Sequence, residues 1–196
     1  YRFPSEAFAR DVAEVTEEHD ITLIADEIQS GLGRTGEWWA SEHYAFDPDV
    51  ITAAKGMRVG ATVSDSETFP DETGRISSTW GAGDILAAAR GAFTLDAIAE
   101  YDLLDNAVER GQQFQETLRD ADLDGVTSVR GKGLMLGLDF ASKGLRDDVI
   151  EAAFSRGLLL LACGRNTIRV LPPMDVTERE IELGAELFVE AIEAEN

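Results

Sequence analysis

Residues 21–36, ITLIADEIQSGLGRTG, and residues 47–56, DPDVITAAKG, decide how this chain folds. Each stretch contains a short apolar run that is followed by a charged residue. Each contains a short run rich in β-branched residues, which is typical of a strand buried in a parallel sheet. The first run ends at Asp26 and the second at Lys55. Ligands of open α/β sheets bind beyond the carboxyl ends of the strands, so we expect Asp26 and Lys55 to lie together at one ligand site.

Helical patterns lie on both sides of these two strands. Ser5 is placed to cap a helix whose apolar residues share one face, and Asp84 is placed to cap a longer one. The apolar stripe of that second helix weakens around residues 101–106. The sequence therefore predicts a first domain over residues 1–105, of α/β class with a mainly parallel sheet.

The remaining residues, 106–196, show a different pattern that predicts a small α+β domain. A last helix is signalled by the capping box from Thr177 to Glu180. The other expected elements are a helix over residues 107–119, strands at 126–129 and 134–139, a helix at 146–155, and strands at 158–162 and 167–171.

The composition excludes several classes of partner. The chain has 196 residues and a formal net charge of −21, with acidic residues spread along its whole length. Such a surface repels nucleic acid and anionic membranes. A solvated surface suited to high salt is favoured over an acidic partner-binding function. No apolar stretch is long enough to span a bilayer and no secretion signal is present, so we expect a cytoplasmic protein.

Few residues are available for metal or histidine chemistry. His19 and His43 are the only histidines and Cys163 is the only cysteine. A histidine triad and a metal site are therefore poorly supported, and we expect no metal. His43 lies beside aromatic residues, where a structural role is the favoured interpretation.

Taken singly, neither charged strand end is decisive. Asp26 is as well explained by a helix cap or by a salt bridge to Arg34, and Lys55 by a side chain that extends to solvent. A carboxylate that loses hydration needs a cationic partner, however, and a desolvated amine becomes nucleophilic enough to form an imine. Together, at equivalent strand ends, they favour one ligand site over two coincidences.

The two opening stretches resemble the long motif and the lysine motif of class III aminotransferases. Residues 129–137, VRGKGLMLG, and 167–173, TIRVLPP, agree with the same family, so the resemblance covers nearly all of the chain. It implies the carboxyl-terminal half of an aspartate-aminotransferase-like (fold type I) enzyme that uses pyridoxal 5'-phosphate. The family's phosphate-binding helix terminus and ring-stacking aromatic come from an earlier segment, so we expect this chain to be inactive alone.

The resemblance assigns roles to three residues of the first domain. Lys55 holds the cofactor as an imine and shuttles the proton of the reaction. Asp26 pairs with the pyridine nitrogen and keeps it protonated, so that the ring accepts electrons. Gln29 hydrogen-bonds near the ring hydroxyl.

Two further roles are implied by the same resemblance. Thr79 matches the residue that binds the cofactor phosphate of the neighbouring subunit, which implies a homodimer of the full-length chain. Arg169 matches the arginine that grips a substrate carboxylate. Without the family match, an ordinary loop threonine and a solvent-facing arginine would be the favoured interpretations.

The substrate class follows from smaller similarities. Thr79-Trp80 and the turn at Cys163-Gly164 are similar to 4-aminobutyrate and lysine 6-aminotransferases, whereas residues 57–61, MRVGA, depart from the family's glycine-rich pattern. We expect transfer of an amino group from such an ω-amino acid to a 2-oxo acid, for example 2-oxoglutarate. The alternatives are an acetylornithine aminotransferase, an aminomutase, a decarboxylase or racemase relative, and a truncated non-catalytic fragment.

Overall fold

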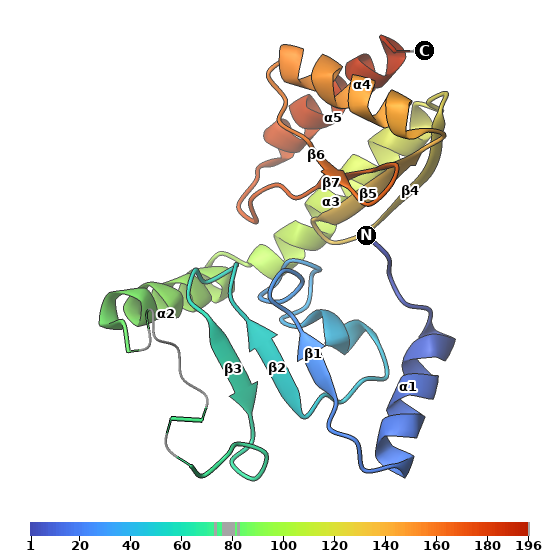
Figure 1. Cartoon of the computed structure of the whole chain (residues 1–196). Helices are drawn as coiled ribbons and strands as arrows, with labels where there is room; N and C mark the ends of the chain where they lie inside the picture. Colours follow the sequence, from blue (N-terminus) through green and yellow to red (C-terminus); the bar gives the residue numbers. More distant parts are fainter. Residues whose placement is uncertain (73, 76–80, 82, 196) are drawn as a thin grey trace. The chain divides into compact units, whose positions relative to one another are not determined.

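The computed structural model describes residues 1–72, 74–75, 81 and 83–195. The chain forms two compact units, which are described separately below (Figure 1). One unit comprises residues Pro4–Leu103. The other comprises Leu104–Asn196 together with Tyr1–Phe3.

The elements of the first unit begin where the sequence places their caps. Ser5 accepts a hydrogen bond from the Phe8 amide at the start of α1, and Asp84 accepts from two amides at the start of α2. Both predicted N-caps are confirmed. In chain order the elements are α1 (Glu6–Glu18), β1 (Ile24–Asp26), the 3-10 helix η1 (Ala40–His43), β2 (Val50–Ala53), β3 (Ala61–Ser64) and α2 (Ile85–Glu100).

The sheet of this unit has the order β1-β2-β3. β1 and β2 run parallel, with Asp26 paired to Thr52, whereas β3 runs antiparallel to β2. β3 was not predicted, because its four residues carry only one large apolar side chain, Val63, and show no run that stands out from a loop. The strand nevertheless completes the hydrogen bonding of β2.

Burial differs from expectation at β1. The sequence predicts a buried strand, but Ile24 is 60% exposed and Ile21 is also exposed. β1 is an edge strand of the described sheet, so no neighbouring strand covers its outer side. The buried apolar residues of this unit are accordingly few, and the largest are Leu32, Met57 and Ile98.

The second unit combines a four-stranded antiparallel sheet, of order β4-β5-β7-β6, with three helices (Figure 1). Thr177 and Glu180 form the predicted capping box of the last helix. The elements are α3 (Leu103–Asp120), β4 (Val126–Lys132), β5 (Met135–Phe140), α4 (Lys143–Ser155), β6 (Leu161–Cys163), β7 (Thr167–Val170) and α5 (Glu178–Glu193).

One face of this sheet and the three helices enclose the main hydrophobic core. Phe114 of α3 and Phe188 of α5 stack at a tilt, with ring centroids 6.2 Å apart. The fully buried residues of β5 and β7 that meet them include Leu138, Phe140 and Ile168. Burial of each such side chain contributes about 2 kcal/mol, so this unit holds most of the apolar stabilisation.

The first three residues belong to this second unit, although the sequence pattern assigned them to the first domain. Nε of Arg130 donates a 2.7 Å hydrogen bond to the carbonyl of Tyr1. Cβ of Tyr1 lies 3.6 Å from the position of a Cβ built on Gly137. The chain start therefore packs over Gly137, on the face of the sheet opposite the core.

Charge on the surface is poorly balanced. Arginines lie within 4 Å of seven carboxylates in the described ranges, against 38 acidic residues in the chain. In six of the seven pairs the carboxylate side chain is at least half exposed, and such solvent-accessible pairs each contribute less than about 1 kcal/mol. Within the described residues, no helix is both long and apolar enough to cross a membrane.

Salt is expected to stabilise the fold, because the screening length falls from about 30 Å at 0.01 M to about 3 Å at 1 M and weakens the repulsion among these carboxylates. The thermal midpoint measured by circular dichroism should rise steadily as sodium chloride is raised over this range. Sucrose at matched osmolality serves as a control without screening. A midpoint that stays constant or falls with sodium chloride would contradict the interpretation of the acidic surface.

Candidate functional site

The carboxyl ends of β1 and β2 lie side by side, as the sequence predicted. The Glu27 amide donates to the Thr52 carbonyl at 2.9 Å, and the Lys55 amide donates to the Ile28 carbonyl at 3.2 Å. These two bonds continue the parallel ladder beyond its last strand residues. Asp26 and Lys55 are therefore held at the same edge of the sheet.

The carboxylate of Asp26 is oriented by one of its two oxygens. Oδ1 accepts hydrogen bonds from the Ile28 amide at 3.1 Å and from the Thr52 hydroxyl at 3.3 Å. No hydrogen bond is made by Oδ2 to any described residue. Asp26 is exposed, so Oδ2 is available to a cationic ligand. The salt bridge to Arg34 that the sequence left open is not among the ion pairs of the described residues.

Lys55 is exposed and follows β2 by two residues. Among the described residues, no carboxylate lies within 4 Å of its amino group. The site thus offers an amine and a carboxylate from neighbouring parallel strands, without a salt bridge that would occupy the amine. Gln29 is half-buried and lies three residues beyond Asp26, at the start of the loop that follows β1.

The loop after β1 is closed by a buried acid that the sequence interpretation did not single out. Glu27 is only 4% exposed. Its Oε1 accepts from the Ser41 amide at 2.7 Å and its Oε2 from the Ser30 hydroxyl at 2.5 Å. The contact with Ser41 joins positions 14 residues apart in sequence, which local patterning does not indicate.

The same loop packs against the residue after Lys55. Leu32 is buried at 3% exposure and has a φ of +61°, a conformation that costs an ordinary residue about 1 kcal/mol. A Cβ on Gly56 would lie 3.0 Å from Cβ of Leu32. The absence of a side chain at Gly56 therefore allows the loop to approach the backbone beside Lys55.

The two other predicted site residues stand apart from this group. Thr79 lies outside the described residues. Arg169 lies on β7 in the second unit, where it is half-buried. Its Nε is buried and makes no hydrogen bond to any described residue. An unmet buried donor costs about 1–3 kcal/mol unless an acceptor binds.

Arg169 shares one sheet face with a second arginine that is already paired. Arg130 and Arg169 both pair with Gly137 across the sheet, so their side chains project from the same face. Arg130 binds Asp139 through two parallel hydrogen bonds of 2.7 and 2.9 Å. The Thr167 hydroxyl also donates to Asp139, at 2.5 Å. Of these two guanidinium groups, Arg169 is the one without an acidic partner among the described residues.

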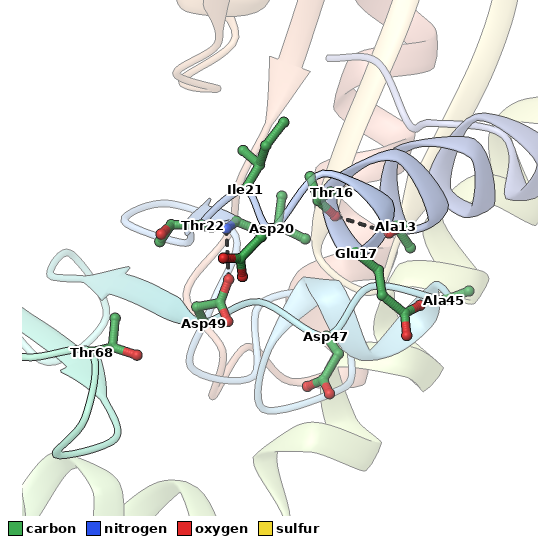
Figure 2. Close-up of a pocket in the computed structure, with 11 residues that line it drawn as sticks. Ala13, Thr16, Glu17, Asp20, Ile21, Thr22, Ala45, Asp47, Asp49 and Thr68 are labelled. Carbon is green, nitrogen blue, oxygen red and sulfur yellow. Dashed lines mark hydrogen bonds between the residues drawn. The ribbon is translucent and has the colours of Figure 1, made fainter.

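A cavity near these strands lies at the opposite end of the sheet. It has a volume of about 590 Å³ and is lined by residues that precede β1 and β2, including Asp20, Asp47 and Asp49 (Figure 2). Oδ2 of Asp49 accepts from the Leu23 amide at 2.7 Å. Its walls are acidic and would repel a phosphate, and neither Asp26 nor Lys55 lines it, so the cavity is not the site predicted from the sequence.

Residues 1–192 match the model of the class-III aminotransferase family. The chain belongs to this family. Its mixed α/β fold is that of a part of the fold type I pyridoxal-phosphate aminotransferases.

Curated relatives support the same family. The chain is 37% identical over 95% of its length to an acetylornithine aminotransferase from Synechocystis sp., and 38% identical over 96% of its length to one from Bacillus subtilis. It is also 34% identical over 96% of its length to an alanine/serine racemase from Pyrococcus horikoshii. These alignments cover 45%, 50% and 43% of the respective relatives, so the chain spans about half their length.

Solved structures agree. An ornithine δ-aminotransferase from Plasmodium falciparum superposes with a TM-score of 0.89 at 28% identity, over 98% of this chain and 52% of the other. A lysine aminotransferase from M. tuberculosis gives 0.85 at 27% identity, over 97% of this chain and 46% of the other. The acetylornithine enzymes among the curated relatives support the alternative substrate class better than the 4-aminobutyrate or lysine class first expected.

A pH effect is expected from Asp139, whose pKa is held below its ordinary value chiefly by the hydrogen bonds from Arg130. Because the folded pKa is depressed, this stabilisation is present above the unfolded pKa of about 3.9 and is lost as the pH falls through the folded value. Asp139→Asn should cost about 2 kcal/mol of unfolding free energy at pH 7. Denaturant unfolding should show that the difference from wild type shrinks below about pH 4.

Glu151 is exposed on α4, so Glu151→Gln is the matched control for removal of a charge. This variant should differ little from wild type in unfolding free energy at either pH. A difference between wild type and Asp139→Asn that stayed constant from neutral pH down to strongly acidic pH would contradict the assignment of this stabilisation to the ionised carboxylate.

Proposed function

We propose that this chain carries the cofactor lysine of a pyridoxal-phosphate-dependent aminotransferase and that Asp26 and Lys55 hold the cofactor between them. The observation that carries the proposal is the pairing of β1 with β2, which puts a carboxylate and an uncommitted amine at one sheet edge. Membership of the class-III family supports the same assignment.

The residues fit the cofactor chemically. Oδ2 of Asp26 has no donor in the described chain and can accept from a protonated pyridine nitrogen, while Oδ1 is kept in place by Ile28 and Thr52. Lys55 would supply the amine that holds the cofactor covalently. Gln29 is placed to bind near the ring hydroxyl. When bound, pyridoxal phosphate supplies an electron sink for the charge that develops on the substrate carbon.

In the proposed reaction, the side chains of this chain position the cofactor and transfer one proton. The amino group of Lys55 would accept the proton that leaves the substrate carbon and would donate it again later in the reaction. The negative charge of Asp26 favours protonation of the ring nitrogen through a charge-assisted hydrogen bond. Thr79 remains a proposed contact for the cofactor phosphate of a partner subunit, which makes a homodimer part of the proposal.

Arg169 is the proposed anchor for a substrate carboxylate. Its buried Nε without an acceptor supports this role, because a carboxylate bound through two parallel bonds would satisfy it. The neighbouring Arg130 is neutralised by Asp139 and offers no competing charge. We therefore infer that Arg169 contributes to binding of the 2-oxo acid acceptor, for example 2-oxoglutarate.

The proposed donor is an amino acid with a terminal amine, and N-acetylornithine is the first candidate. The acetylornithine aminotransferases among the curated relatives support it, at 37% and 38% identity. Lysine is the second candidate, supported by the likeness to a lysine aminotransferase and by the Thr79-Trp80 pair. Racemisation stays an alternative to amino-group transfer, because one curated relative is named as an alanine/serine racemase.

Attachment of the cofactor can be tested directly on this chain. After incubation with pyridoxal 5'-phosphate and reduction with borohydride, peptide mass spectrometry should find the label on Lys55 several-fold above Lys132 and Lys143. Asp26→Asn should weaken cofactor binding about 10- to 100-fold, because it removes a hydrogen bond to a charged group. Absorbance titration measures the dissociation constant.

Asp47→Asn is the matched control, since it removes a carboxylate from the opposite end of the same sheet and should leave the dissociation constant unchanged. Equal labelling of all three lysines in the wild-type chain would refute Lys55 as the cofactor lysine.

Donor choice is tested by glutamate-linked turnover with 2-oxoglutarate, on this chain and on any longer product that contains it. N-acetylornithine should be used more efficiently than lysine, and both more efficiently than 4-aminobutyrate. Arg169→Lys should raise the KM for 2-oxoglutarate about tenfold or more by loss of the bidentate contact, with labelling of Lys55 unchanged. Formation of D-amino acids without glutamate consumption or production would favour the racemase alternative instead.

A further inference from the structure

A buried carboxylate that the proposed chemistry does not use lies next to Asp26. Glu27 is 4% exposed, and no cationic side chain of the described residues lies within 4 Å of it. Burial of a charge without a counter-ion is costly unless hydrogen bonds compensate. Here both carboxylate oxygens are used, one by the Ser41 amide and one by the Ser30 hydroxyl.

These bonds tie together the two ends of one loop. Ser30 lies at its beginning and Ser41 in η1 at its end. Between them, the Leu32 and Gly33 amides both donate to the Trp38 carbonyl, and the Gly31 amide donates to the carbonyl of Glu27. A Cβ on Gly31 would lie 3.0 Å from Cβ of Glu27. Glu27 thus contacts both the beginning and the end of the loop.

The closed loop in turn makes two contacts with the backbone around Lys55. The Ile28 carbonyl accepts from the Lys55 amide at 3.2 Å. Leu32 packs against Gly56, where an added Cβ would lie 3.1 Å from its Cδ1. Ile28 directly follows Glu27 in sequence. Leu32 lies in the loop between Ser30 and Ser41, the two residues that hydrogen-bond to Glu27.

We propose that Glu27 is a positioning residue for Lys55, acting through the loop that it closes and through the contacts of Ile28 and Leu32. Its chemical meaning rests on the proposed function, since Lys55 is the residue that would carry the cofactor. Glu27 itself touches neither cofactor nor substrate in this assignment. Its role depends on the two hydrogen bonds and not on the negative charge.

The test compares two variants. Glu27→Ala leaves the Ser41 amide and the Ser30 hydroxyl without their acceptor, whereas Glu27→Gln can form hydrogen bonds to both. The glutamine carbonyl can still accept from the Ser41 amide, and its NH2 group can donate to the Ser30 oxygen. Hydrogen exchange followed by mass spectrometry should show several-fold faster exchange of the Lys55 amide in Glu27→Ala. Glu27→Gln should remain close to wild type. Peptides from β4 and β5 in the other unit are the internal reference.

Borohydride labelling with pyridoxal 5'-phosphate supplies a second readout. The ratio of label on Lys55 to label on Lys143 should fall several-fold in Glu27→Ala and recover in Glu27→Gln. If the wild-type chain does not favour Lys55, the proposed function fails, while the exchange experiment still decides the positioning role. The two failures are therefore distinguishable.

Ser30→Ala removes one donor and leaves the glutamate in place, so it decides the matter if Glu27→Ala does not fold. It should accelerate exchange at Lys55 to a smaller extent. The proposal is overturned if a folded Glu27→Ala, or Ser30→Ala in its place, exchanges Lys55 at the wild-type rate. It is also overturned if Glu27→Gln loses protection and labelling as severely as Glu27→Ala, because that result would assign the role to charge.

Discussion

The parallel hydrogen bonds between β1 and β2 are the constraint on which the site depends. They align Asp26 with Thr52 and continue beyond the strands through the amides of Glu27 and Lys55. A slip of one residue in a sheet reverses the face on which every side chain projects. The distance between the carboxylate and the amine is thus set by backbone bonding, and the side chains need only the correct residue types at the strand ends.

Stability and chemistry are distributed unevenly between the two units. The second unit has a continuous core, in which Phe114, Leu138 and Phe188 are buried among three helices and a sheet. The first unit has few buried apolar residues, and it accepts two locally unfavourable features, a buried carboxylate at Glu27 and a left-handed Leu32. Such features persist when surrounding contacts over-determine them, and they concentrate at functional sites.

Much of the architecture could be predicted because it rests on local signals. Ser5, Asp84 and Thr177 are short-range capping signals, and the structure confirms all three. The adjacency of Asp26 and Lys55 followed from the general behaviour of parallel strands. The prediction that β1 is buried was wrong. The exposure of Ile24 depends on which strand lies beside β1, and the residues of β1 alone do not show this. The burial of Glu27 was missed for a related reason. Two adjacent acidic residues are typical of an exposed segment, whereas Glu27 is buried and accepts a hydrogen bond from Ser41, 14 residues away in sequence.

The type of reaction and the choice of substrate depend on different groups of the protein. Relatives named for transamination and for racemisation align with this chain at 34% to 38% identity, so a likeness of this extent is compatible with more than one outcome. A carboxylate and an amine at one sheet edge can prepare a cofactor for either. Specificity must then come from groups that contact the substrate away from the reacting carbon. Arg169 is the proposed group of this kind, a role supported by its buried Nε, which has no acceptor among the described residues, and by the pairing of the neighbouring Arg130 with Asp139. We therefore propose that Arg169 contributes selectivity for carboxylates and that Asp26 and Lys55 contribute the chemistry.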